Sequence, residues 1–361
     1  MVPLISPSSP ISVPHQISRR QGLRLLISAL GCVAFQRTTT LNAASPQLLL
    51  PTSNNSILKP GAEASYFVGT AGKSWHSGQF GCVRSNGFQM HEGIDIRCVR
   101  RDANGEPNDP IMASANGTVS YISRSPGLSN YGIYLILRHQ FEEISFYTLY
   151  AHLREVRNKL RVGETVRAGD PIGVMGRTSN TRQKISKDRA HLHFEINFLL
   201  NERFDEWNRK NNPGQRNDHG AFNGQNLVGI DPSIVFRQQA SMGSRFSFLD
   251  HLRNQTELCR VLVRRTQFSW LKRYVPLVRR NPLADREGFA GFEVALNYNG
   301  VPYQLIPRAT SEIRTISDGS VVSVNTQELA ARGCRQLLKK SKFGHELSAK
   351  GQRLISLLTF S

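Results

Sequence analysis

Four of the ten histidines fall into three short stretches whose side chains could bind a metal ion and act on a water molecule. A zinc ion in a hydrolase needs three protein ligands and an open position for water, and imidazole nitrogen and carboxylate oxygen both serve as ligands. The three stretches are His91-Glu92-Gly93-Ile94-Asp95, Tyr150-Ala151-His152-Leu153 and His191-Leu192-His193-Phe194-Glu195. They predict a hydrolytic metal site built from histidine and aspartate.

The spacing of the histidines supports a shared site. His191 and His193 lie two residues apart in an expected strand, so both side chains point to the same face, one able to hold metal while the other faces substrate. His152 ends an apolar strand, a position from which polar groups commonly project into a cleft. A His-x-His pair alone is more often structural, and it is the combination of stretches that favours a site. The chain has no His-Glu-x-x-His, so a helix-borne zinc site is not expected.

The sequence around these residues predicts short strands. Residues 67–240 alternate β-prone runs with turn residues at short spacing, which favours a mostly β domain with an antiparallel sheet or sandwich over parallel βαβ units. The expected strands include 119–122, 131–139, 144–151 and 192–198, with a run of tight glycine turns over 160–176 and a polar insertion at 201–228.

The C-terminal third has a different pattern of apolar residues. Apolar residues recur at helical spacing near 247–274, 326–340 and 345–359, and two strands, 291–296 and 301–307, flank the hairpin signal Asn299-Gly300. A linker at about 237–246 separates the two parts. We therefore expect a second, smaller α+β domain over 245–361, with no recognisable chemistry of its own.

Positive charge is unevenly distributed. The formal net charge is +19, and residues 245–361 hold 19 Lys/Arg against 9 Asp/Glu. Such a region attracts polyanions, of which nucleic acid, anionic lipid and anionic wall polymers qualify on charge alone, whereas a merely solubilising surface is the alternative. Without an aromatic-basic motif or zinc-finger spacing, nucleic acid is not an expected partner.

The N-terminus resembles an export signal. Residues 1–44 contain four arginines and no acidic residue, and the paired Arg19-Arg20 precede an apolar run of signal-peptide length, as in a twin-arginine signal. Cleavage is expected near Ala43-Ala44, with a lipoprotein-type site at Cys32 as the alternative. Residues 45–66, rich in Ser, Asn and Pro, are expected to be a linker. No later segment has the length of a membrane span, so we expect an exported product of the periplasm, cell envelope or extracellular space.

Four cysteines remain after the signal, an even number that suits two disulfides in an exported chain. Two lie in each half, so the expected pairs are Cys82–Cys98 and Cys259–Cys334. Buried free thiols are the alternative.

The three stretches resemble the motif set of the lysostaphin-like, or β-lytic, zinc metalloendopeptidases, whose members carry His-x-Gly-x-Asp, Tyr-x-His-Leu and His-Leu-His-Phe-Glu. A Pro-Ile-x-Ala strand at 110–119 and the turn glycines Gly163, Gly169 and Gly173 match as well. The resemblance covers about residues 78–235.

By this resemblance, one zinc ion per chain is held by His91, Asp95 and His193. His152 and His191 are then the catalytic residues beside the zinc-activated water, and which of them is the base stays open. The neighbouring Glu92 and Glu195 are interpreted as structural.

The resemblance implies an enzyme that hydrolyses peptide bonds in bacterial peptidoglycan, in a stem peptide or a cross-bridge, with anionic wall polymers as further partners of the basic C-terminal region. The charged approach to His191, residues 181–190, departs from the small residues usual in the family and leaves substrate preference open. The alternatives are a non-catalytic wall-binding or hydrolase-activating protein of the same fold, and a zinc peptidase that acts on proteins.

Overall fold

Strand β10 (His191–Leu199) is the buried centre of the large sheet. Its sequence alternates aromatic and β-branched residues with histidine and asparagine, and all nine residues are buried. The computed structural model describes residues 47–182 and 184–361. The expected export signal lies outside these residues.

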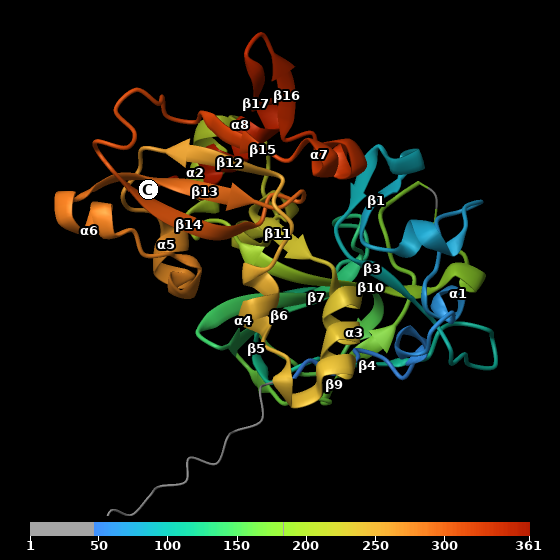
Figure 1. Ribbon diagram of the computed structural model, residues 1–361. Helices are drawn as coiled ribbons and strands as arrows, with labels where there is room; N and C mark the ends of the chain where they lie inside the picture. Colours follow the sequence, from blue (N-terminus) through green and yellow to red (C-terminus); the bar gives the residue numbers. More distant parts are fainter. Residues whose placement is uncertain (1–46, 183) are drawn as a thin grey trace, which may run out of the picture. The chain divides into compact units, whose positions relative to one another are not determined.

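Within the described residues the large sheet has nine strands, all paired antiparallel, with the main order β11-β10-β7-β6-β5-β8 (Figure 1). Strand β3 continues the edge of β10 beside β11, and β9 links β7 to β4. The other members are β3 (Ile94–Arg97), β4 (Pro110–Met112), β5 (Gly117–Ser123), β6 (Ile133–Phe141), β7 (Ile144–Val156), β8 (Thr165–Val166), β9 (Pro171–Met175) and β11 (Leu227–Ile230). The expected mostly β, antiparallel fold is therefore confirmed.

Strand β7 changes partner part-way along its length. Up to Ala151 it pairs with β10, and from Leu153 onwards it pairs with β9. His152, between these two segments, has a left-handed backbone with φ of 60°. That conformation costs a non-glycine residue about 1–3 kcal/mol and turns the strand where the histidine projects.

One face of the sheet is covered by helix α3 (Pro232–Met242), which begins at the Asp231 N-cap and packs against β10 with Phe236 stacked on Phe194 (Figure 1). This helix, followed by a single turn at Gly243–Arg245, occupies the stretch expected to be a linker at 237–246.

The described part of the other expected linker, 47–66, also packs onto the sheet. It contains the turn η1 (Ser56–Leu58) and the short helix α1 (Glu63–Tyr66), and Leu48, Ile57 and Tyr66 are buried. These buried residues could not be recognised in the sequence, because they are widely spaced within a mostly polar segment.

The C-terminal region, residues 245–361, contains a four-stranded antiparallel sheet of order β14-β13-β12-β15 and a separate hairpin β16-β17. The hairpin expected at Asn299-Gly300 is present, and Gly300 has φ of 89°. The elements are α4 (Phe248–Arg253), β12 (Cys259–Val263), α5 (Ser269–Arg273), α6 (Pro282–Glu287), β13 (Phe289–Leu296), β14 (Pro302–Ala309), β15 (Val321–Val324), α7 (Thr326–Arg332), β16 (Leu338–Ser341), β17 (Gly344–Leu347) and α8 (Ala349–Leu358).

The helical expectations for this region were too long. Strand β12 interrupts 247–274, because the run Cys259–Val263 contains two β-branched valines and pairs with β13 along its whole length and with β15 over 259–261. The segment 326–340 is likewise a helix followed by strand β16. By its contacts the region belongs to one compact unit with residues 44–244, and a domain boundary near 245 stays a prediction.

The disulfide pairing differs from the expectation. Cys82 is bonded to Cys334, 252 residues away, while Cys98 and Cys259 are buried free thiols. Cys98 donates its thiol to Asp109 Oδ2 at 3.0 Å, and Cys259 lies inside the sheet on β12. The expected pairs are wrong because they assumed that each cysteine bonds to a partner in the same half of the chain. The bond joins strand β1 (Gly81–Arg84) to the turn η9 (Gly333–Arg335).

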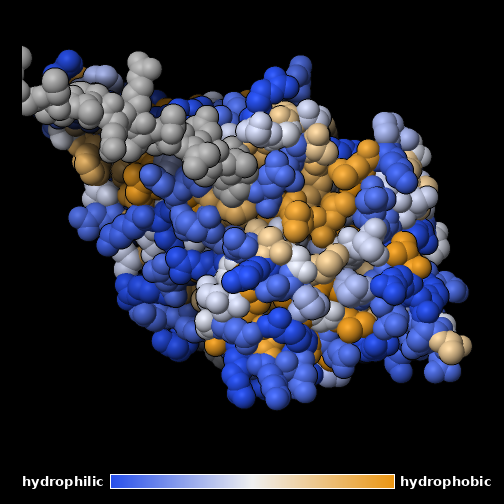
Figure 2. Space-filling model, turned by 90° about the horizontal axis from the view of Figure 1, so that it is seen from below, coloured by the Kyte–Doolittle hydropathy of each residue, from blue (hydrophilic) through white to orange (hydrophobic). Residues whose placement is uncertain are grey.

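Among residues 47–182 and 184–361, we find no helix that combines the length and apolarity needed to cross a bilayer. Hydrophilic residues predominate on the face shown in Figure 2, with apolar residues in smaller groups between them.

Candidate functional site

Sheet register brings the predicted residues together. In β10, His193 lies opposite Asp95 of β3 on one side and opposite Ala151 of β7 on the other. Asp95, His193 and Ala151 therefore lie side by side on three neighbouring strands. His152 follows Ala151 at the bend of β7, which places a second histidine next to this row. His191, two residues before His193, shares its face of the sheet.

His91 reaches this row from the end of strand β2 (Gln89–His91), which forms a hairpin with β1. The connection to Asp95 passes over β10 at Gly93, where an added Cβ would stand 2.6 Å from the carbonyl oxygen of Phe194 and 2.9 Å from His193 Cε1. Glycine is therefore needed here for close approach.

The three predicted ligands present converging atoms. His91 Nε2 lies 3.2 Å from His193 Nδ1 and 3.2 Å from Asp95 Oδ1, and His193 Nδ1 lies 3.0 Å from Asp95 Oδ1. Tetrahedral zinc with bonds of about 2.0–2.1 Å holds its ligand atoms about 3.3 Å apart. The donor set and its spacing thus fit a zinc ion. All three residues are buried.

The hydrogen bonds of His91 Nδ1 and His193 Nε2 determine which ring nitrogens face the predicted metal position. His91 Nδ1 lies 2.7 Å from the carbonyl oxygen of Gln79, and His193 Nε2 lies 2.7 Å from Glu195 Oε1. Because both partners only accept, these nitrogens carry the protons, and His91 Nε2 and His193 Nδ1 are left with inward lone pairs. Glu195 is therefore a support for His193, in agreement with its structural interpretation.

His152 and His191 are held in the same way beside this centre. His152 Nδ1 donates to the carbonyl oxygen of Thr178 at 2.9 Å, and His191 Nδ1 donates to that of Arg189 at 2.6 Å. The two rings are 4.9 Å apart, and His191 Nε2 lies 3.6 Å from Asp95 Oδ1. Each Nε2 is thus free of the proton and able to accept one.

Burial and charge set the protonation of the group. Burial, reinforced by the nearby His191 and His193, lowers the pKa of His152 well below its usual range, and burial also lowers the pKa of His191. Burial opposes ionisation of Asp95, but the surrounding histidines hold its pKa well below the usual range. The pair His152 and His191 is accordingly neutral and the aspartate ionised.

His193 behaves differently. Burial opposes its protonation, but the hydrogen bonds to Asp95 and Glu195 outweigh that effect and raise its pKa to about 9. The position between these groups therefore attracts positive charge, either a proton or a metal ion.

Two residues that contact the candidate site carried no recognisable sequence signal. Arg84 Nη2 donates to Asp95 Oδ2 at 2.6 Å and lies 2.9 Å from His91 Nε2. Tyr131 donates its hydroxyl to Glu195 Oε1 at 2.7 Å. Both depend on contacts that form only when the hairpin β1-β2 and the start of β6 fold over β10.

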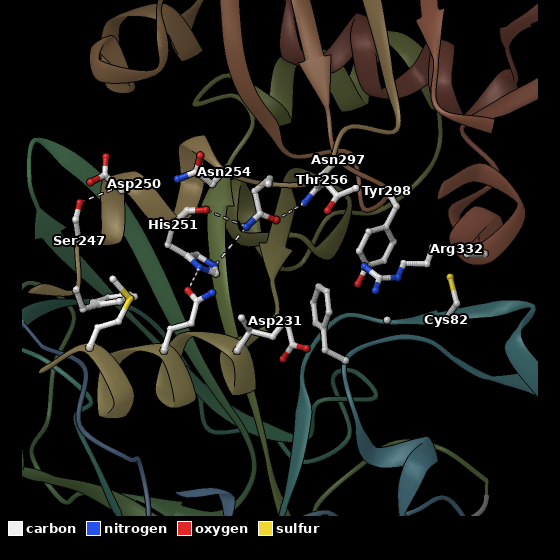
Figure 3. Close-up of a pocket in the computed structure, with 18 of the residues that line it drawn as sticks. Cys82, Asp231, Ser247, Asp250, His251, Asn254, Thr256, Asn297, Tyr298 and Arg332 are labelled. Atoms are coloured by element: carbon white, nitrogen blue, oxygen red, sulfur yellow. Dashed lines mark hydrogen bonds between the residues drawn. The ribbon is translucent and has the colours of Figure 1, made fainter. Parts of the chain in front are cut away.

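The predicted residues line an open cavity of about 370 Å³. A larger one, of about 590 Å³, lies between β1, α3 and the C-terminal region (Figure 3). There His251 Nδ1 is 2.7 Å from Gln238 Oε1, and the Ser247 hydroxyl accepts from the backbone N–H of Asp250. Those contacts are ordinary structural ones, so the smaller cavity is the candidate site.

Comparison with known proteins finds similarity over the same part of the chain. The model of peptidase family M23 matches residues 89–206. A lipoprotein NlpD/LppB homolog of Pseudomonas aeruginosa is 35% identical over 116 residues, which cover 32% of this chain and 32% of that protein. Lipoprotein NlpD of Yersinia enterocolitica is 32% identical over 97 residues, which cover 27% of this chain and 86% of that protein. The chain thus spans about a third of the first relative.

Solved structures are similar at lower identity. The catalytic domain of lysostaphin from Staphylococcus simulans is 20% identical, with 45% of this chain and 87% of that chain covered and a TM-score of 0.27. A zinc-containing peptidase from Vibrio cholerae is 18% identical, with 43% and 34% covered and a TM-score of 0.22.

Proposed function

Because the chain belongs to peptidase family M23, we propose that it is an exported zinc metalloendopeptidase that hydrolyses peptide bonds in bacterial peptidoglycan. The observation that carries this proposal is the convergence of His91 Nε2, Asp95 Oδ1 and His193 Nδ1 within 3.0–3.2 Å of one another, beside two neutral histidines. A structural role alone would not require two imidazole nitrogens and a carboxylate oxygen to converge on one point.

In this proposal His91, Asp95 and His193 hold the metal. A zinc ion there would polarise the scissile carbonyl group and lower the pKa of a water molecule toward about 7. Gln79 and Glu195 keep the two ligand rings in the tautomers that expose the inward lone pairs.

His152 and His191 would act on the proton of the attacking water. Each presents an unprotonated Nε2, and the fixed Nδ1–H bonds to backbone carbonyls prevent the rings from turning away. Once protonated, His191 is stabilised by Asp95, whose Oδ1 lies 3.6 Å from its Nε2. A protonated histidine at this place can also stabilise the negative charge that develops on the carbonyl oxygen.

The experiment compares the purified chain with two variants. The wild-type protein should bind about one zinc per chain and release soluble muropeptides from isolated sacculi. His193→Ala should lose both zinc and release, whereas His152→Ala should keep zinc and lose release. Full release by His193→Ala would overturn the site assignment.

The same experiment decides against the non-catalytic alternative. A wall-binding or hydrolase-activating protein would sediment with sacculi and release no fragments by itself. An outcome of that kind from zinc-loaded wild-type protein would reject the enzyme and leave only the family. Export and binding of the basic C-terminal region to anionic wall polymers are further parts of this proposal.

A further inference from the structure

Two arginines stand over the candidate site from different parts of the chain. Arg84 comes from strand β1, and Arg189 comes from the turn η4 (Lys187–Arg189) that leads into β10. Both line the same cavity as the predicted ligands. Arg84 has a side chain only 17% exposed, so its charge is largely removed from water.

The two guanidinium groups are held by different partners. Arg84 binds Asp95 Oδ2 at 2.6 Å, and Arg189 is anchored through Nε to the carbonyl oxygen of Gly69 at 3.0 Å. Burial lowers the pKa of Arg189, Asp95 opposes this, and the charge of Arg84 adds to the lowering. Both positive charges therefore lie at one cavity, and like charges gathered at one place favour an anion that offsets them.

The cavity contains few negative charges that could offset the two arginines. Among the described residues that line it, the acidic ones are Asp95 and Glu92, and Glu92 is paired with Arg335 at 3.1 Å. Asp95 is also a predicted ligand, and Arg84 Nη2 lies 2.9 Å from His91 Nε2, so a bound divalent cation would compete with Arg84 for both residues. The loaded site would then carry two arginines and a metal against a single aspartate.

We propose that Arg84 and Arg189 form a carboxylate subsite, and that the substrate is a peptide with a free carboxylate beside the cleaved bond. This inference rests on the proposed function and narrows it. Guanidinium groups bind carboxylates through paired N–H donors, and the compensation of two clustered charges strengthens that contact. Peptidoglycan stem peptides carry such carboxylates, whereas an uncharged oligoglycine bridge offers none at the bond.

Arg189 belongs to the charged segment that leads into β10. Arg189 stands two residues before His191, and its own carbonyl oxygen fixes the His191 ring. The side chain that would bind substrate and the backbone that orients a proton acceptor therefore belong to one residue. A carboxylate seated on Arg189 is placed next to the proposed chemistry.

The test measures binding separately from cleavage. Zinc-loaded His152→Ala protein is titrated by calorimetry with a stem-peptide dimer, with the same dimer after amidation of its carboxylates, and with pentaglycine. We expect the free-carboxylate dimer to bind at least about ten-fold more tightly than the other two, which corresponds to about 1.4 kcal/mol. Equal binding of the dimer and its amidated form would overturn the proposal.

Arg189→Gln in that background supplies the residue-level test. It should weaken binding of the free-carboxylate dimer about ten-fold and leave the amidated dimer unchanged, with Arg189→Lys in between. Lys187→Gln is the matched control, since it removes one charge from the same turn but pairs with Glu106 and does not line the cavity. Equal weakening by the two glutamine variants, or equal loss for both dimers, would contradict the subsite.

These outcomes are distinguishable from failure of the proposed function. A wild-type protein that selects carboxylates but cuts nothing would leave the subsite in place and reject the peptidase. One that cuts sacculi yet binds both dimers equally would reject the subsite alone.

Discussion

Replacing Glu195 by glutamine should weaken zinc binding about 10- to 100-fold without unfolding the protein. The carboxylate is buried and accepts from three donors, His193 Nε2 at 2.7 Å, Tyr131 Oη at 2.7 Å and Asn197 Nδ2 at 2.5 Å. It thereby keeps the proton on His193 Nε2 and the lone pair on Nδ1. Glutamine is neutral and has a single acceptor oxygen, so its amide must face either Asn197 or the position shared by His193 and Tyr131.

The size of the effect follows from that mismatch. A buried donor left without an acceptor costs about 1–3 kcal/mol, and the His193 ring can escape the cost by turning. A ring that turns withdraws Nδ1 from Asp95 Oδ1, which lies 3.0 Å away. The loss of affinity corresponds to about 1.4–2.8 kcal/mol, which competition with a fluorescent zinc chelator resolves.

Glu92→Gln is the matched control. Glu92 also flanks a predicted ligand, but its side chain is 42% exposed and pairs with Arg335 at the surface. A surface ion pair of this kind contributes about 0–1 kcal/mol, so zinc affinity should change less than about three-fold. Wild-type affinity in Glu195→Gln, or an equal loss in Glu92→Gln, would refute the supporting role of Glu195.

Other perturbations test different parts of the same structure. Zinc affinity should rise with pH up to about 9, because the pKa of His193 is raised to about 9 without metal, and calorimetry in buffers of different ionisation enthalpy should count the released proton. The metal-free protein should lose about 3 kcal/mol of stability as pH rises through that range, since a raised pKa stabilises the fold below the unfolded value of about 6.5 and the benefit ends above the folded one. A melting temperature of the chelator-treated chain that rises over this range would contradict the assignment. Replacing Cys82 and Cys334 by serine opens a link between residues 252 apart, which should cost about 5 kcal/mol in the chain-entropy model and shift the urea midpoint down. Gly93→Ala should lower thermal stability and zinc affinity together because its Cβ would meet β10, whereas Gly127→Ala, with nothing within 4 Å, should change neither.

The strands around the site are predictable because their signal is local. Strands β6 and β7 begin with runs of aliphatic and aromatic residues, β10 alternates apolar with polar residues, and turn residues precede β6. The five predicted site residues fall within short motifs, and the antiparallel register of β3, β10 and β7 brings them together. Their roles as ligands and proton acceptors stay predictions until metal and activity are measured.

What could not be predicted depends on contacts between distant segments. Nothing near Cys82 marks Cys334 as its partner, since the bond requires β1 and η9 to meet in the folded chain. Arg84 precedes His91 by seven residues and belongs to no pattern, and only the β1-β2 hairpin returns it to Asp95. Similarly, the buried anchors of 47–66 are too sparse to show a periodicity.

The far end of strand β10 has a practical consequence for anyone who wishes to excise the half of the chain that contains the candidate site. The hydroxyl of Tyr274 accepts the backbone N–H of Leu199, Phe198 lies edge-on to Trp270, and Asn201 donates to the carbonyl oxygens of Leu357 and Phe360. A fragment ending near residue 240 would expose these apolar contacts to solvent. It would also leave the buried side-chain amide of Asn201 without its two acceptors. We expect such a fragment to precipitate, so the last third of the chain supports the large sheet and should be retained in any recombinant product.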